Sequence, residues 1–129
     1  MEIKFRGISL ITNDFVYGSL IMYDPIPEIT DCTIGENDYE YNNEEVDIKT
    51  IGQFTGKKDK HEQDIYGGDI VIQNIQSEYL DVTDWKQVKG EVKQINGLWC
   101  VGKEHYPLFA FENEVIGNIH ENLELKENV

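Results

Sequence analysis

The chain has 129 residues, 40% of them hydrophobic, and its 25 acidic and 11 basic residues give a net charge of −14. A chain of this length can bury about two thirds of its unfolded surface, enough for one domain that needs no disulfide or metal. The charge disfavours binding to nucleic-acid phosphates and anionic membranes. No apolar run approaches the roughly 18 residues that a membrane helix needs, and the start lacks the layout of a signal peptide, so we expect a cytoplasmic protein.

Alternating apolar and aromatic residues predict three strands at the start of the chain. Ile3–Leu10 and Phe15–Tyr23 are separated by a short polar turn and therefore predict a hairpin. Pro25 and Pro27 end the second strand, since proline cannot donate to a ladder. Glu28–Ile34 is the third predicted strand.

The segment Gly35–Asp47 contains six acidic residues and no base. Repulsion between like charges favours a solvated loop there. Its spacing does not fit the ligand pattern of an EF-hand calcium loop. This acidic loop is a candidate interaction surface, through long-range attraction to a basic partner, and its candidate residues are Glu36, Asp38, Tyr39, Glu40 and Tyr41.

The rest of the chain contains several short strands separated by glycine turns. Asp69–Ile75 is a β-branched run, and Asn96-Gly97 supplies the two positive-φ positions of a two-residue hairpin turn. Pro107–Phe111 and Glu114–Ile119 predict two more strands. This pattern predicts a mainly β fold, a small SH3-like barrel with an N-terminal β-hairpin extension and little helix.

Within a single domain of residues 1–129 we expect an N-terminal β portion with the acidic loop at 1–45, a barrel portion at 46–122 and a tail at 123–129. Gly52, Gly56, Gly67 and Gly68 suit strands broken by tight turns, where a positive φ is needed. Asp69 follows Gly68 and is expected to accept backbone N–H groups in an Asx-type turn.

No residue pattern indicates catalysis or a metal site. The three histidines lack ligand spacing, and Cys32 and Cys100 lie in apolar contexts typical of buried thiols. We therefore expect no cofactor and no enzymatic activity. Lys57, Lys58 and Lys60 form the one basic cluster, which either contacts phosphates or is a turn that pairs with nearby acids.

Five segments in order resemble the hallmark of the YopX family: Val46–Gly56, Lys58-Asp-Lys60, Ile65-Tyr66, Gly68–Val71 and Glu114–Asn122. The resemblance implies a mainly β domain with a barrel in a phage or prophage protein of the bacterial cytoplasm. It implies no established activity and no catalytic residue. The positions that it marks as structural are Gly52, Gly56, Tyr66, Gly68, Asp69, Gly117 and Asn118.

The chain departs from the family pattern at two turns. His61–Asp64 stands where the family tends to have Asn-Gly, and Gly67 stands where it tends to have glutamate. We therefore expect a longer turn after Lys60, and no role for the missing glutamate is carried over.

These observations lead to a functional hypothesis. The protein is expected to be a non-enzymatic phage or prophage accessory protein that acts through protein–protein contacts, with a second copy of itself or a host factor as partner. The alternative is a nucleic-acid-linked barrel that binds through Lys57–Lys60, or an acidic mimic of DNA. Neither a membrane nor a small-molecule substrate is expected.

Overall fold

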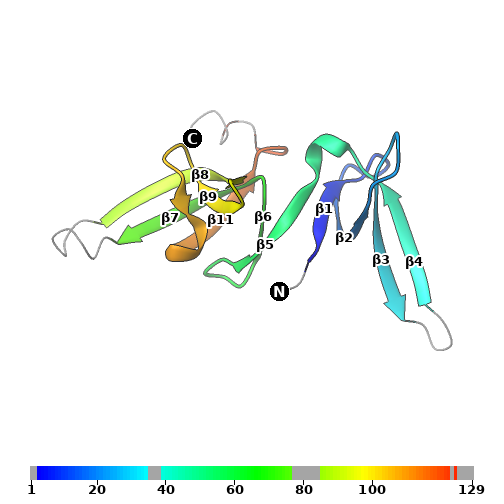
Figure 1. Ribbon diagram of the computed structural model, residues 1–129, viewed down its shortest axis with the longest axis horizontal. Helices are drawn as coiled ribbons and strands as arrows, with labels where there is room; N and C mark the ends of the chain where they lie inside the picture. Colours follow the sequence, from blue (N-terminus) through cyan, green and yellow to red (C-terminus); the bar gives the residue numbers. More distant parts are fainter. Residues whose placement is uncertain (1–2, 35–38, 77–84, 123, 125–129) are drawn as a thin grey trace. The chain divides into compact units, whose positions relative to one another are not determined.

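The computed structural model describes residues 3–34, 39–76, 85–122 and 124, and its fold is mainly β (Figure 1). The prediction of a mainly β protein is confirmed. Two short 3₁₀ turns, η1 (Ile48–Thr50) and η2 (Leu108–Ala110), interrupt the strands. Within the described ranges no helix has the length and apolar character needed to cross a membrane.

The chain divides into two compact units, unit 1 (residues 1–54) and unit 2 (residues 55–129). The strand β5 (Gly52–Lys58) contains the boundary. The division therefore falls several residues after residue 45, the end that we expected for the N-terminal portion.

Unit 1 is an antiparallel sheet in the order β4-β3-β2-β1, with the first residues of β5 paired to β1. Its strands are β1 (Phe5–Ile8), β2 (Phe15–Ile21), β3 (Glu28–Ile34) and β4 (Tyr39–Glu45). The predicted hairpin of β1 and β2 is confirmed, and β3 has the predicted bounds.

The core of unit 1 is small and depends on close approach between strands. Among the described side chains, its buried apolar members are Ile29, Val46 and Phe54. A Cβ at Gly7 would lie 3.0 Å from the Cβ of Val46, so a larger residue would push the strands apart. Arg6 is also buried, and its guanidinium lies 4.3 Å from the centre of the Phe15 ring.

The prediction of a solvated acidic loop is wrong for Tyr39–Glu45. This segment is β4, and it pairs with β3 residue by residue from Ile34↔Tyr39 to Glu28↔Glu45. Charge repulsion within the segment does not prevent a strand, because β3 offers a β-branched, apolar partner with a full ladder of hydrogen bonds. Glu36 and Asp38 lie outside the described residues.

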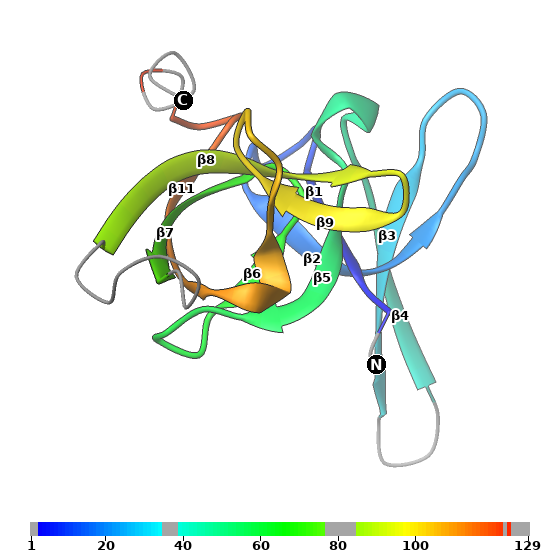
Figure 2. The ribbon, with the colours of Figure 1, turned by 60° about the vertical axis from the view of Figure 1, so that its left-hand side comes forward.

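Unit 2 contains a five-stranded antiparallel sheet in the order β10-β9-β8-β7-β11. Its strands are β7 (Asp69–Gln76), β8 (Trp85–Ile95), β9 (Leu98–Val101), β10 (Tyr106–Pro107) and β11 (Glu112–Asn118), and β6 (Asp64–Tyr66) follows β5. The long strand β8 is strongly curved (Figure 2). Asn96 and Gly97 have φ of 50° and 83°, so the predicted two-residue hairpin turn is confirmed.

The strands of unit 2 enclose an apolar core but do not close into a barrel. Ile65, Val71, Val92, Val101 and Leu108 are fully buried, and Trp99 and Val115 pack against them. The five-stranded sheet ends at β11 on one side and at the two-residue strand β10 on the other. Closure needs an unbroken ladder of strands, so in place of the small SH3-like barrel that we predicted the fold has two antiparallel sheets that form no closed barrel.

The register of β3 and β4 predicts a charge effect on stability. Glu28 and Glu45 lie directly opposite each other, and like charges at such positions repel. We expect Glu45→Gln to raise the free energy of unfolding by about 0.5 kcal/mol in urea denaturation. The gain should shrink in about 1 M salt, where screening is strong.

Glu112→Gln is the matched control, because Glu112 lies opposite Asn74 rather than an acid. An equal gain for Glu112→Gln would mean that relief of the general negative charge, not the Glu28–Glu45 pair, is responsible.

Candidate functional site

Three of the segments that resemble a family hallmark come together in unit 2. The turn Lys58-Asp-Lys60, the strand entry Gly68–Val71 and the segment Glu114–Asn122 are far apart in sequence. In the structure Asp59 bonds to Val115, and Gly68 bonds to Ile119. The meeting point of the three segments is therefore the candidate functional site of unit 2.

Asp59 is the centre of this meeting point. It is 5% exposed, and its Oδ1 accepts hydrogen bonds from the backbone N–H groups of His61 (2.8 Å) and Gln63 (2.9 Å). Its Oδ2 accepts from the N–H of Val115 (3.0 Å) on β11. Burial alone would raise the pKa of the Asp59 carboxyl, but the three N–H donors outweigh burial and hold the pKa below its ordinary value.

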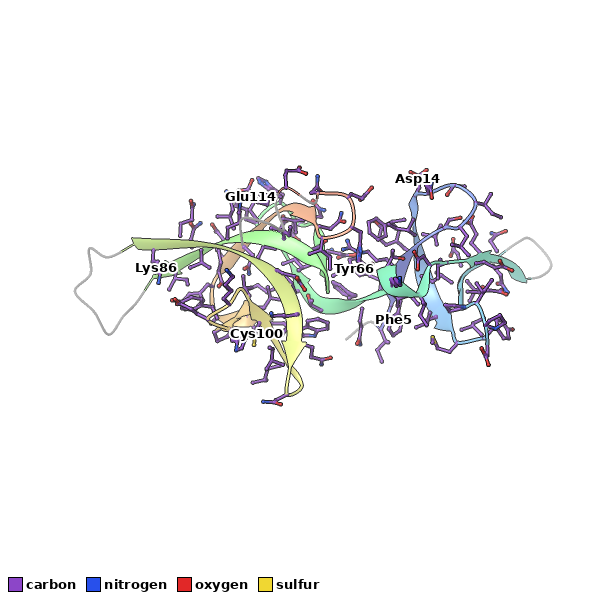
Figure 3. The ribbon with its side chains drawn as sticks, turned by 90° about the horizontal axis from the view of Figure 1, so that it is seen from above. Phe5, Asp14, Tyr66, Lys86, Cys100 and Glu114 are labelled. Carbon is purple, nitrogen blue, oxygen red and sulfur yellow. The ribbon has the colours of Figure 1, made fainter. Side chains whose placement is uncertain are left out.

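The same turn covers the outer edge of β11. The N–H of Lys60 donates to the carbonyl oxygen of Asn113 (2.9 Å), two residues before Val115. On the surface, Lys60 Nζ lies 3.1 Å from Glu114 Oε2, and His61 Nε2 lies 3.7 Å from Glu114 Oε1. We call Asp59, Lys60, Asn113 and Val115 the β11 clasp; Figure 3 labels Glu114 on this strand.

The second motif forms a turn around Gly68 and Asp69. Asp69 is 2% exposed, and its Oδ2 accepts from the N–H of Tyr66 (2.8 Å), so the predicted turn carboxylate is confirmed. The N–H of Gly68 donates to Val92, and its carbonyl accepts from Ile119, both at 2.9 Å. These bonds join β6, β8 and the end of β11 at one turn.

Two of the four glycines have the predicted positive φ. Gly56 (87°) and Gly68 (92°) lie in the left-handed region. Gly52 and Gly67 are not among the positive-φ glycines of the described ranges, and Gly52 instead pairs with Arg6 in the sheet. The expected positive φ is therefore confirmed at Gly56 and Gly68 and not found at Gly52 and Gly67.

The third motif ends β11. The register with β7 shifts between Val115 and Gly117, which makes a β-bulge. Asn118 follows, and its Oδ1 accepts from the backbone N–H groups of His120 (3.0 Å) and Glu121 (2.9 Å). Gly117 and Asn118 thus terminate a strand and start the next turn.

The basic cluster does not present three equivalent lysines. Lys57 Nζ donates to the carbonyl oxygens of Leu108 (2.9 Å) and Phe111 (2.7 Å), and burial lowers the pKa of Lys57. Lys60 pairs with Glu114, whereas Lys58 is exposed. Lys57 therefore anchors the η2 turn of its own unit.

Sequence reasoning missed two buried amides that share this anchoring. Asn113 Nδ2 donates to Leu108 (3.1 Å) and Phe111 (2.9 Å), the same carbonyls that Lys57 contacts. Gln73 Nε2 donates to Pro107 (3.0 Å). Each amide lies at a buried position of its strand. Strand periodicity alone does not distinguish such a polar residue from one that faces outward, so the sequence did not indicate its role.

The candidate contact residues Tyr39, Glu40 and Tyr41 lie on β4 in unit 1, opposite Ile34, Thr33 and Cys32. The structure describes their backbone. No group of three or more His, Cys, Asp or Glu side chains in the described ranges forms a possible metal site.

The comparisons with known proteins agree with the motifs. The family model described as YopX protein matches residues 4–127, nearly the whole chain. This chain belongs to the YopX family. The YopX resemblance is therefore confirmed, and the YopX segments of unit 2 contribute Asp59, Lys60 and Val115 to the β11 clasp and form the turns beside it.

A solved structure has the same fold. Protein EF1440 from Enterococcus faecalis has a TM-score of 0.61 and 21% sequence identity, with 97% of this chain and 98% of that chain covered. At this identity the likeness concerns the fold alone. No curated protein matches the chain at a significant level.

The β11 clasp predicts a pH-dependent loss of stability. We expect Asp59→Asn to lower the free energy of unfolding by about 2 kcal/mol at neutral pH, because an amide cannot accept from all three N–H groups as a carboxylate does. Since the folded-state pKa is lowered, the contribution of the carboxylate is complete above the ordinary aspartate pKa of about 4. It is lost as the pH falls through the lowered value.

Urea denaturation between neutral and acid pH measures this difference, with the exposed Glu62→Gln as control in the same turn. The gap between wild type and Asp59→Asn should narrow only below about pH 4. A gap that stays constant into strong acid would contradict a charged Asp59 as the source of the stabilisation.

The lysine cluster predicts that Lys57 and Lys58 contribute differently to the free energy of unfolding. We expect Lys57→Met to lower the free energy of unfolding by about 1 kcal/mol or more, because two hydrogen bonds from a charged donor are lost. Lys58→Met should stay within about 0.5 kcal/mol of wild type, as exposed substitutions usually do. Thermal or urea unfolding of the two variants compares them, and equal values would show that Lys57 is not an anchor.

Proposed function

We propose that this YopX protein is a non-enzymatic phage or prophage accessory protein that acts through protein–protein contacts made by unit 1. One observation carries the proposal. Of the ten exposed large apolar side chains among the described residues, eight lie in unit 1: Ile3, Leu10, Ile11, Tyr17, Met22, Tyr23, Ile26 and Ile48. Exposed apolar side chains concentrated in the smaller unit favour a surface that a partner covers.

The charge of unit 1 indicates which partner would fit. Between Arg6 and Lys49 the chain has ten acidic residues and no lysine or arginine. Arg6 is buried over Phe15, and Lys4 Nζ lies 4.7 Å from the centre of the Phe54 ring. The negative field around this segment therefore has little local compensation, and it would attract a protein with a basic surface.

In this proposal unit 2 does not supply the contact surface. Its YopX motifs are engaged in internal hydrogen bonds, and among its described residues the exposed large apolar side chains are Leu98 and Phe109. We regard unit 2 as an open sheet of SH3-like curvature. A cytoplasmic protein with a protein partner, either a second copy or a host factor, is part of the same proposal.

Binding of a nucleic acid through Lys57–Lys60 is the weaker alternative. Lys57 donates to carbonyls of unit 2, and the exposed Lys60 pairs with Glu114, which leaves Lys58 as the exposed lysine for which the described residues show no such contact. A single lysine releases few counterions and gives little affinity for DNA at physiological salt. The acidic mimic of DNA remains as a special case, in which the basic surface of the partner is itself a DNA-binding surface.

Partner capture with matched variants tests the proposal. Ile11→Thr combined with Met22→Thr removes apolar contacts from unit 1, whereas Leu98→Thr combined with Phe109→Thr removes two from unit 2. We expect wild type and the unit 2 variant to enrich the same basic protein from a bacterial host lysate. The unit 1 variant should retain at least about fivefold less of it, as for loss of central contacts in an interface.

Thermal unfolding of both variants controls for misfolding, and quantitative mass spectrometry reads the captured proteins. Equal capture by the two variants would refute unit 1 as the contact surface. Added duplex DNA separates the alternatives: DNA displaces the partner only if this protein occupies a DNA-binding surface.

A further inference from the structure

Within the described part of the chain, the strand β4 has an outer edge with no neighbouring strand in its sheet. β4 is the terminal strand of the sheet in unit 1, beyond β3 (Figure 1). A terminal strand presents its outward N–H and C=O groups as a template for another strand unless something covers them.

The ladder shows which groups of β4 face outward. The N–H of Val46 donates to the carbonyl of Pro27 (3.1 Å), which continues the register Glu28↔Glu45 by one residue. In an antiparallel pair the residues that bond to the partner alternate with residues that bond outward. Val46, Glu44 and Asn42 therefore bond toward β3, and Glu45, Asn43, Tyr41 and Tyr39 direct their N–H and C=O groups outward.

Among the residues that the structure describes, the cover of this edge lies at one end. The carbonyl oxygen of Glu45 accepts from the N–H of Leu10 (3.0 Å), and Ser9 forms an isolated bridge with Val46. Within the described residues no backbone partner lies on the outer side of Asn43, Tyr41 and Tyr39. The edge of β11 in unit 2 is different, because the β11 clasp covers it.

The acidic residues around the edge select a basic occupant. Glu28 and Glu45 lie on one face of the β3–β4 ladder, and Asp31 and Glu44 lie on the other, as the register and the alternation of side chains require. One carboxylate oxygen of Glu44, Oε2, is shielded from solvent and has no hydrogen-bond partner among the described residues. A lysine or arginine beside it would supply the missing donor.

A second copy of the chain fits this edge poorly. Pairing two β4 strands would set Glu44 and Glu45 of one copy among the acids of the other, and like charges across strands are destabilising. Acidic residues on an edge strand are a known protection against self-association. The same charges do not oppose a strand that carries lysine or arginine.

We propose that β4 accepts an extended basic segment of a partner protein as an added strand, paired along Tyr39–Asn43. This inference rests on the proposed function and specifies its binding mode. The backbone groups of Tyr39, Tyr41 and Asn43 supply affinity, and the acids on both faces supply selectivity for basic residues.

Two peptides of the same sequence test strand addition. One is a peptide of valine, threonine and lysine as long as β4, and the other has all its interior amides N-methylated, which removes the donors but keeps the charge. We expect the unmethylated peptide to bind at least about tenfold more tightly by calorimetry. It should also slow amide hydrogen exchange at Tyr39, Tyr41 and Asn43.

Asn43→Pro blocks one outward N–H without a change of charge, and Asn43→Thr keeps that N–H and is its control. Proline is tolerated on an edge strand at a position whose N–H faces outward. We expect the proline variant to bind the peptide at least about tenfold more weakly than the threonine variant. Equal binding of the two peptides, or no binding of either, overturns strand addition.

The test separates this inference from the proposed function. If the partner captured by unit 1 is retained equally by Asn43→Pro and Asn43→Thr, the contact function holds and the edge is not its binding mode. If no partner depends on unit 1 but the peptide pair behaves as expected, the edge binds strands and the proposed contact surface is wrong.

Discussion

The carboxylate of Asp59 is the interaction on which the arrangement of unit 2 depends. It accepts three backbone N–H groups, two from its own turn and one from β11. A carboxylate in this position replaces a backbone carbonyl of a neighbouring strand, so the outer side of β11 is satisfied without another strand. Buried N–H groups that lose such an acceptor are costly, and the turn and the strand therefore stabilise each other.

Other polar side chains of unit 2 also bind backbone groups. Asp69 fixes the turn before β7, and Asn118 fixes the turn after β11. Lys57 brings a cation to the carbonyls of Leu108 and Phe111. Asp59, Asp69, Asn118 and Lys57 thus all engage backbone groups of their own unit.

Local signals in the sequence predicted the local structure well. Asn96-Gly97 specified a hairpin because both φ values must be positive, and β3 was found as a run rich in β-branched residues between the prolines and a glycine. The strand β4 was missed, since its stability comes from pairing with β3 and not from its own acidic residues. Gln73 and Asn113 were missed for a related reason: their partners, Pro107, Leu108 and Phe111, are fixed only by the tertiary fold.

The sheet edges show how the two units differ. In unit 2 the edge of β11 is covered by Asp59 and Lys60. In unit 1 the described residues that cover the outer edge of β4 do so at Glu45. A protein that only needed protection from aggregation could use charge alone at such an edge. Unit 1 combines the charge with exposed apolar side chains and with a shielded carboxylate oxygen on Glu44 that has no donor among the described residues. Protection of an edge requires neither of these last two features, whereas a basic partner strand would use both.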